Sequence, residues 1–361
     1  MWCSSPRSRR SLVWVVVGLL LGARPADAHE TARLEYPDGF ELPASLAFRV
    51  QFWIDVFTRY SLREAVVHDR AHPERVLAVL PLKVGDSAEL AEIKASYEEV
   101  IREVATAPTF TPSPFLNLFL PPVDPSAIAA AAGVDRVRVQ PGQREVFAKS
   151  ILRSRRYLDA IRREFERAGL PQTLAYLPHV ESSFDSEARS SAGAVGMWQL
   201  MADTARPVIR VDDEVDERTY PVKATAAAAA YLTRAYVALG NWPLALTAYN
   251  YGIAGTVRAV QALGADDLTD LIAHHDGVNW GFACKNFYAQ FLAAVHVAEN
   301  TGDYFPELVY PNGIEHVVRK GDTLWHLSRR YGVPIESIRE SNALSGATTQ
   351  LRLGQRLMIR G

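Results

Sequence analysis

The sequence contains little cysteine and no excess of either charge. Its two cysteines are Cys3 and Cys284, and Cys3 lies close to the start of the chain. If a leader is removed, no internal disulfide can form, and the hydrophobic core must supply the stability. Cys284 has no nucleophile signature around it and is expected to be a buried packing thiol. With 39 basic and 41 acidic side chains the formal net charge is −2, which gives no indication of nucleic-acid binding.

A long apolar run is also missing, because the run at Leu12–Leu21 is too short to span a bilayer comfortably. Three arginines precede this run, and Ala26-Asp27-Ala28 follows it as a small-x-small cleavage pattern. The arrangement is typical of a secretory signal peptide over residues 1–28. The alternatives are an uncleaved anchor and an N-terminal core helix. Removal of residues 1–28 leaves 35 basic and 40 acidic side chains, a net −5, which argues against charge-driven binding to anionic membranes or polymers.

Hydrophobic periodicity predicts a mainly α-helical protein with short connections. Apolar residues recur at helical spacing in the segments 48–60, 89–104, 143–168, 171–183, 222–239, 242–251 and 287–300. A further alanine-rich helix is expected at 127–132, after a proline-rich linker at 108–125. Beyond residue 306, short apolar runs at 316–318 and 356–360 predict two strands, and 323–331 and 334–341 predict two helices between them. Asp322 is the expected N-cap of the first of these helices.

One acidic residue follows an apolar stretch. Leu174–Val180 precede Glu181, near the end of the helix expected at 171–183, where the negative end of the helix dipole disfavours the ionised form. Burial disfavours ionisation as well, so the carboxyl group is expected to have a raised pKa. A carboxyl group that keeps its proton near neutral pH suits the acid that protonates the leaving oxygen of a glycosidic bond. Glu181 is therefore the candidate catalytic acid of a sugar-cleaving enzyme.

No second carboxylate occurs in a comparable setting. Asp185, Glu187 and the acidic cluster at 212–217 lie in polar stretches. They are expected to be loop and surface charges, with Asp216 or Glu217 at most structural. A single catalytic carboxylate favours a mechanism in which the substrate's own groups stabilise the cation and one of its hydroxyls is the nucleophile. Glu181 then acts first as an acid and later as a base.

Four short motifs occur in order along the chain. They are Glu181-Ser182, Gly196-Met197-Trp198-Gln199, Ala248-Tyr249-Asn250-Tyr251-Gly252 and Asn286-Phe287-Tyr288. Together they resemble the motifs of the lysozyme-like lytic transglycosylases. The tryptophan in the second motif, the run Asp216-Glu217-Arg218 and the alanine-rich helix most resemble the membrane-bound lytic murein transglycosylase D group. The resemblance covers residues 140–305 and implies a lysozyme-like helical catalytic domain.

The resemblance also implies roles for individual residues. It makes Glu181 the catalytic residue, and the implied substrate-binding residues are Ser182, Met197, Gln199, Tyr249, Asn250 and Tyr288. Ser182, Met197 and Gln199 are expected to line the substrate cleft, Tyr249 and Asn250 to lie near Glu181 and the scissile sugar, and Tyr288 to close the site. Core packing is the alternative for Met197, Trp198, Tyr251 and Tyr288.

Two departures from the family pattern occur. The last motif usually has an acidic residue and Thr-Arg before its tyrosine, whereas Cys284-Lys285-Asn286-Phe287 stand there in this chain. In addition, Asn250 is followed by Tyr251, where a small residue is common. Either departure is expected to alter the shape of the cleft without removing Glu181.

The C-terminal module, residues 314–361, resembles a LysM domain. The matching stretches are His316-Val317-Val318-Arg319-Lys320-Gly321-Asp322-Thr323-Leu324-Trp325, Tyr331-Gly332-Val333, Asn342 and Leu353-Gly354-Gln355. Domains of this family bind N-acetylglucosamine in glycans, which implies glycan contacts by Gly321, Asp322, Thr323, Leu324 and Asn342. Helix capping and turn formation are the alternatives for Asp322 and Asn342.

These observations lead to one set of expectations for the whole chain. We expect a signal peptide (1–28), a helical N-terminal region (29–140), a lysozyme-like domain (141–306), a linker (307–313) and a small βααβ LysM domain (314–361). The resemblance implies a lyase that cleaves the β-1,4 bond between N-acetylmuramic acid and N-acetylglucosamine, leaving 1,6-anhydro ends. The alternatives are a hydrolytic muramidase and a non-catalytic wall-binding protein. The expected partner is the glycan strand of peptidoglycan, with no nucleic acid, and the family favours a periplasmic, wall-associated location.

No cofactor or metal is expected. His68 and His72 lie four residues apart but lack the adjacent glutamate of the metalloprotease arrangement. His274 and His275 are neighbours, so their side chains are expected to point in different directions.

Overall fold

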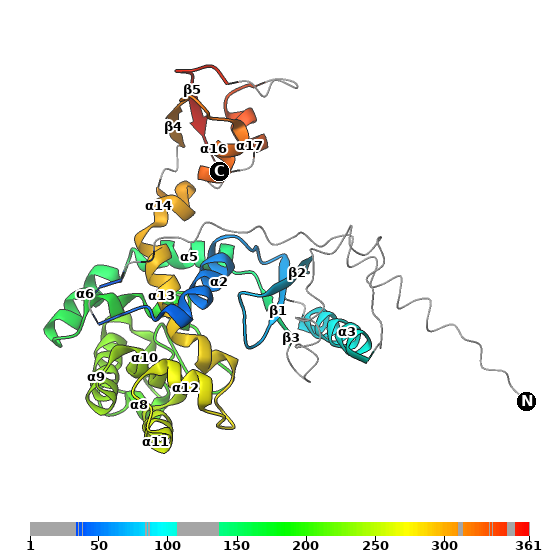
Figure 1. Ribbon diagram of the computed structural model, residues 1–361. Coiled ribbons are helices and arrows are strands. Elements are labelled where there is room, and N and C mark those ends of the chain that lie inside the picture. Colours follow the sequence, from blue (N-terminus) through cyan, green and yellow to red (C-terminus); the bar gives the residue numbers. More distant parts are fainter. Residues whose placement is uncertain are drawn as a thin grey trace, which may run out of the picture. The chain divides into compact units, whose positions relative to one another are not determined.

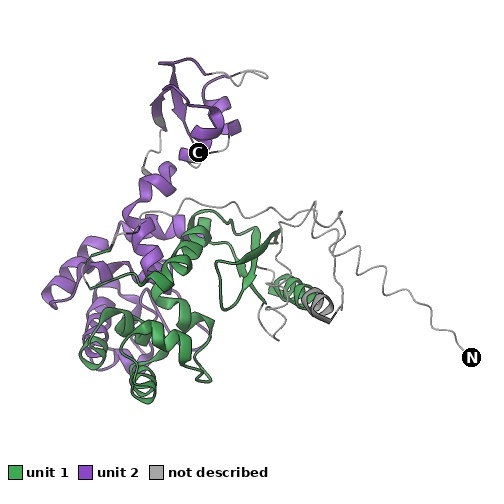
Figure 2. Cartoon of the chain, viewed as in Figure 1, with its two compact units in different colours: residues 1–145, 235–290 green, residues 146–234, 291–361 purple. Residues whose placement is uncertain are grey.

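The computed structural model describes residues 34, 36–37, 39–83, 85, 87–106, 137–309, 313–331, 333, 335–344 and 351–360. The expected signal peptide, the proline-rich linker and the alanine-rich helix at 127–132 lie outside these residues. Helices predominate in the described part (Figure 1). The chain forms two compact units, one of residues 1–145 and 235–290, the other of residues 146–234 and 291–361 (Figure 2). The domain boundaries expected from the sequence remain a prediction.

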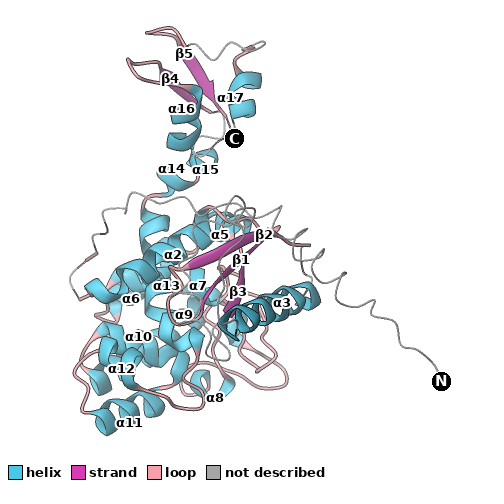
Figure 3. Cartoon of the chain, turned by 45° about the vertical axis from the view of Figure 1, so that its right-hand side comes forward, coloured by secondary structure: helices cyan, strands magenta, loops and turns pink. Residues whose placement is uncertain are grey.

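The first unit begins with η1 (Ala44–Leu46) and α2 (Ala47–Thr58), followed by β1 (Glu64–Asp69), β2 (Val76–Pro81), α3 (Ser87–Thr106) and β3 (Val137–Pro141). The helices α2 and α3 confirm the two predicted in this region. The three strands were not expected. They form an antiparallel sheet in the order β2-β1-β3. The helix α3 lies beside this sheet (Figure 3). Its Leu90, Ile93 and Tyr97 pack against apolar side chains of the strands.

The same unit contains α10 (Trp242–Tyr251), α11 (Ile253–Leu263), α12 (Leu268–His274) and the first half of α13 (Phe282–Glu299). Local chemistry sets the limits of α10. The side chain of Asn241 caps its start by accepting a hydrogen bond from Leu244 N at 2.9 Å. The helix ends at Gly252, whose φ of 90° is readily adopted only by glycine.

Residues 40–58 contribute several buried side chains to the core of this unit. Phe40 stacks on Trp242 at 5.8 Å between ring centroids. Arg49 and Trp53, one turn apart on α2, both donate hydrogen bonds to Asn286 Oδ1, at 3.3 and 3.4 Å. Because buried polar groups need such partners, α2 stabilises α13 directly. The N-terminal region therefore braces the segment that contains the fourth motif.

The second unit contains the first motifs. Its elements are α5 (Arg144–Ser154), α6 (Leu158–Arg167), η3 (Gln172–Tyr176), α7 (Pro178–Glu181), α8 (Ala202–Ala205), η4 (Glu217–Thr219), α9 (Pro221–Leu239), the second half of α13, α14 (Thr301–Tyr304) and α15 (Pro306–Val309). Two predictions were too simple here. The helix predicted over 143–168 is interrupted between α5 and α6. The helix predicted over 171–183 is a 3₁₀ turn followed by a single α-helical turn.

The C-terminal module has β4 (Ile314–Val317), α16 (Leu324–Tyr331), α17 (Ile335–Ser341) and β5 (Arg356–Ile359). The strands pair antiparallel, with Ile314 opposite Ile359. Its small core consists of Val318, Leu324, Leu327, Val333, Ile338, Leu357 and Ile359. The predicted strand–helix–helix–strand order is confirmed.

Candidate active site

Glu181 is the last residue of α7, a single turn that begins with Pro178. The backbone then reverses sharply, since the N–H groups of Ser182 and Phe184 both donate to Pro178 O, at 3.1 and 3.0 Å. Ser183 and Phe184 have φ angles of 55° and 57°. For residues other than glycine such angles cost about 1 kcal/mol or more each. The Phe184 side chain is only 1% exposed, and its burial contributes about 2 kcal/mol that offsets this strain.

The carboxyl group of Glu181 is surrounded by protein atoms. No described residue donates a hydrogen bond to it or forms an ion pair with it. Desolvation by the surrounding atoms raises its pKa from 4.5 to about 8. The side chain nevertheless keeps some exposed surface, so the raised pKa reflects crowding of the carboxyl group and not complete sealing from water. At neutral pH Glu181 is therefore mainly protonated, as a proton donor needs to be.

A buried histidine fixes the turn that carries Glu181. His179 lies between the rings of Phe147, Tyr176 and Phe184, at centroid distances of 5.0, 6.1 and 4.5 Å. Its Nδ1 is hydrogen-bonded to the hydroxyl of Ser150 on α5 at 2.6 Å. Burial lowers the pKa of His179 to about 3, so the ring is neutral and acts as a packing and hydrogen-bonding group.

Ser182 links the first motif to the second. Its hydroxyl donates to Met197 O at 2.7 Å and accepts from Asp185 N at 3.1 Å. Met197 and Trp198 have no exposed surface, and Trp198 Nε1 donates to Thr225 Oγ1 at 3.1 Å. These contacts favour the packing alternative for Met197 and Trp198. The Ser182 hydroxyl thus has two backbone partners. The substrate contact expected for Ser182 remains a prediction.

Gly196 allows two stretches of backbone to approach closely. A Cβ atom at this position would lie 2.0 Å from Arg218 O, and the φ angle is 79°. Gln199, at the end of the same motif, has a φ of 46°. Its amide nitrogen donates to Gly196 O at 2.9 Å and to Ala188 O at 3.3 Å. The Gln199 side chain thus stabilises the fold of the loop, and its contact with substrate remains a prediction.

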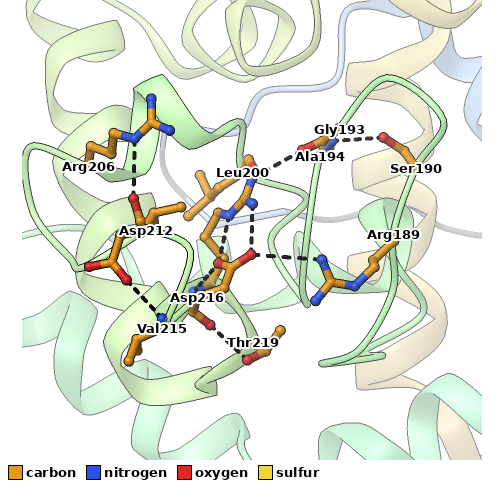
Figure 4. Close-up of polar contacts among 12 residues, drawn as sticks. Arg189, Ser190, Gly193, Ala194, Leu200, Arg206, Asp212, Val215, Asp216 and Thr219 are labelled. Atoms are coloured by element: carbon orange, nitrogen blue, oxygen red, sulfur yellow. Dashed lines mark hydrogen bonds and ion pairs between the residues drawn. The ribbon is translucent and has the colours of Figure 1, made fainter.

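Arg218 stabilises this loop by hydrogen bonds to Gly193, Leu200 and Asp216, three residues that Figure 4 labels. Its guanidinium group donates two hydrogen bonds to the carboxylate of Asp216, both at 2.8 Å. A third nitrogen donates to Gly193 O at 3.1 Å and to Leu200 O at 3.0 Å. Arg218 is 7% exposed, and its hydrogen bonds lower the pKa of Asp216. The structural role anticipated for Asp216 is confirmed, whereas the role of Arg218 was missed by the sequence analysis.

The remaining motif residues belong to the other unit. Asn250 lies exposed near the end of α10, next to the half-buried Tyr249. The thiol of Cys284 donates to Asn250 Oδ1 at 3.1 Å. Tyr288 is 1% exposed, and its hydroxyl donates to Glu41 O at 2.9 Å. These contacts favour packing for Tyr288, and the expected closure of the site by this residue remains a prediction.

In the C-terminal module, the five predicted glycan-binding residues differ in exposure. Gly321 and Thr323 are exposed, Asp322 and Asn342 are half-buried and Leu324 is buried. The prediction of Asp322 as an N-cap was wrong. Thr323 Oγ1 accepts from His326 N at 3.1 Å, whereas Asp322 accepts from Arg319 N and His316 Nε2 at 2.7 and 2.8 Å.

Asn342 connects the end of α17 to β5. Its amide nitrogen donates to Ile338 O at 2.7 Å and to Met358 O at 2.6 Å, and its Oδ1 accepts from Met358 N at 2.6 Å. The turn-forming alternative therefore accounts for Asn342. Trp325, which is 56% exposed, was not among the predicted binding residues.

Two other features are absent from the described ranges. No group of three or more histidine, cysteine, aspartate or glutamate side chains there is arranged to hold a metal ion. None of the helices in that part of the chain has the length and apolar character needed to cross a membrane.

Comparison with known proteins agrees with this arrangement. Residues 160–270 match the transglycosylase SLT domain, and residues 316–360 match the LysM domain. Membrane-bound lytic murein transglycosylase D of Escherichia coli strain K12 is 27% identical over an alignment of 218 residues, which covers 58% of this chain and 41% of the relative. The same protein from E. coli O6:H1 matches equally. An autolysin of Enterococcus faecalis is 44% identical over 48 residues, 13% of this chain and 6% of the relative.

The chain thus spans about two fifths of the length of the transglycosylase D proteins that it matches. The family matches fall on the segments that contain Glu181, the second and third motifs and the C-terminal module. This protein therefore combines a transglycosylase SLT domain with a C-terminal LysM domain and is homologous to membrane-bound lytic murein transglycosylase D.

Proposed function

We propose that this protein is a lytic transglycosylase that cleaves the β-1,4 bond between N-acetylmuramic acid and N-acetylglucosamine in peptidoglycan without water. The observation that carries the proposal is the Glu181 carboxyl group, which has no polar partner among the described residues and a pKa raised to about 8. Such a group is protonated before the reaction and is able to donate its proton to the glycosidic oxygen.

The acidic residues closest to Glu181 in sequence support a single-carboxylate mechanism. Asp185 forms an ion pair with Arg153 at 3.2 Å, and Glu187 is exposed. Asp216, farther along the same unit, is paired with Arg218. None of the three has a crowded, unpaired carboxyl group like that of Glu181. A two-carboxylate hydrolysis, in which the second group activates water or attacks the sugar, therefore has weaker support.

The mechanism uses Glu181 twice. Its proton goes to the glycosidic oxygen as the bond from that oxygen to C1 of the muramic acid breaks. The carboxylate left on Glu181 then takes the proton of the C6 hydroxyl of the same sugar, and O6 forms a bond to C1. The products are a free 4-hydroxyl on the leaving sugar and a 1,6-anhydro end, and Glu181 is protonated again.

The C-terminal domain extends this proposal to the insoluble polymer. We infer that it binds N-acetylglucosamine residues of the glycan and keeps the catalytic domain near its substrate. Even a weak tether raises the effective concentration of a polymer at a linked site. A murein substrate, together with the signal peptide expected at residues 1–28, places the protein in the periplasm in this proposal.

Mass spectrometry of digested peptidoglycan tests the reaction. Purified sacculi treated with the wild-type protein should release muropeptides with anhydro ends, and Glu181→Gln should release none. Reducing ends without the anhydro bridge would establish the hydrolytic muramidase instead. The absence of products from the wild-type protein would favour the non-catalytic wall-binding alternative.

A further inference from the structure

The segment between α12 and α13 packs around the end of α10. The hydroxyl of Tyr251 is hydrogen-bonded to His275 Nε2 at 3.1 Å. The indole of Trp280 lies edge-on to both rings, at centroid distances of 4.9 Å from Tyr251 and 5.3 Å from His275. A Cβ atom on Gly277 would come within 2.7 Å of the Tyr251 hydroxyl, so the chain passes close to the tyrosine. Tyr251, where the family commonly has a small residue, thus fixes residues 275–280 against the third motif.

This packing places the Cys284 thiol beside Asn250. Cys284 is 7% exposed, and its Sγ lies 3.1 Å from Asn250 Oδ1 and 3.4 Å from Asn279 O. A thiol has one proton to donate, and the shorter contact goes to the amide oxygen of Asn250. The Nδ2 group of the exposed Asn250 then makes no hydrogen bond to any residue that the structure describes, and its two N–H donors are available to a ligand.

We propose that Cys284 is a positioning residue for Asn250. By donating to Oδ1, the thiol holds the amide plane so that Nδ2–H faces away from the protein as a donor to an oxygen atom of the glycan. This inference rests on the proposed function, in which Asn250 binds substrate. The side chain of an exposed asparagine otherwise turns freely, and ordering it on binding costs free energy. A hydrogen bond made before the substrate arrives reduces that cost.

Three single variants and one double variant separate positioning from packing. Cys284→Val keeps the approximate volume of the side chain but removes the donor, and it should lower kcat/KM for soluble glycan strands about three- to tenfold. Cys284→Ser keeps a donor and should recover most of this loss. Asn250→Ala removes the group on which Cys284 acts. In that background Cys284→Val should cause no further loss, because the two changes act through one contact.

Thermal unfolding of each variant checks that the kcat/KM values being compared belong to folded proteins. Equal losses from Cys284→Val in the wild-type and Asn250→Ala backgrounds would overturn the positioning role, and so would a serine variant as impaired as the valine variant. Normal activity of Asn250→Ala would overturn it as well. The products of the wild-type protein report on the proposed function separately. If they lack anhydro ends, the proposed function fails; if they have them and the losses are additive, only the role of Cys284 fails.

Discussion

Replacing Glu181 by glutamine should change the way in which stability depends on pH. The carboxyl group has a pKa of about 8 in the folded protein, against an ordinary value of 4.5. Below about pH 4.5 the group is protonated in both the folded and the unfolded chain. Between these values the unfolded chain releases the proton while the folded protein keeps it, so the free energy of unfolding falls as the pH rises. Glutamine does not titrate, so the Glu181→Gln variant lacks this pH dependence.

The size of the effect follows from the shift. Each pH unit inside the window lowers the free energy of unfolding by at most about 1.4 kcal/mol. Because the Glu181 side chain keeps some exposed surface, solvent screening reduces the total, and we expect a loss of about 2–3 kcal/mol between pH 4.5 and 8. Glu181→Gln should therefore equal the wild type in stability at pH 4 and exceed it by that amount at pH 8, and under the proposed function it should no longer cleave glycan.

Urea unfolding at pH 4, 6 and 8, with circular dichroism as the signal, measures the difference in the free energy of unfolding between the variant and the wild type. Glu187→Gln is the matched control, since Glu187 lies in the following loop and is exposed, and its pH profile should parallel that of the wild type. If the profile of Glu181→Gln also ran parallel to the wild type, the raised pKa of Glu181 would be refuted. The assignment of this residue as the proton donor at neutral pH would lose its physical basis.

Three further perturbations test other parts of the structure. Arg218→Met should lower the free energy of unfolding by about 3 kcal/mol and reduce cleavage. Arg210→Met removes only surface ion pairs and should have little effect. Equal urea midpoints for the two variants would contradict the structural role of Arg218. Gly196→Ala should destabilise the protein by about 2 kcal/mol or more, and Gly193→Ala less, because its nearest neighbour is 3.9 Å from the added carbon. Deletion of residues 312–361 should weaken co-sedimentation with peptidoglycan, and unchanged sedimentation would refute the tether.

Helices with strong local signals were predictable from the sequence. The segment 242–251 has an asparagine before it and a glycine after it, and α10 occupies that segment. The sheet of β1, β2 and β3 was not predictable in this way, because β1 is buried on both faces and lacks the alternation of polar and apolar residues that marks a half-buried strand. Its polar residues His68 and Asp69 are buried too. Aspartate is mostly exposed in proteins and histidine is intermediate in burial, so the burial of these two residues could not be predicted from the sequence.

Part of the candidate site was predictable from the sequence, because Glu181 is an acidic residue that follows an apolar run. The helix dipole was expected to contribute to the raised pKa of Glu181, but α7 is a single turn, and crowding of the carboxyl group is the cause of the shift. The contacts of Arg218 were not predictable, because two of its acceptors, Gly193 O and Leu200 O, are separated from it by 25 and 18 positions. Contacts of that kind depend on the tertiary fold and leave no periodic signal in the sequence.

The hydrogen bonds from Arg49 and Trp53 to Asn286 have a consequence for modularity. A gene fragment starting at residue 141 would encode the four motifs but not α2, leaving the amide oxygen of Asn286 without its two donors. It would also expose the face of Trp242 on which Phe40 stacks. A catalytic segment that is moved into another protein should therefore include residues 40–58. By the same reasoning, recombination at the 140/141 junction would yield an aggregation-prone product.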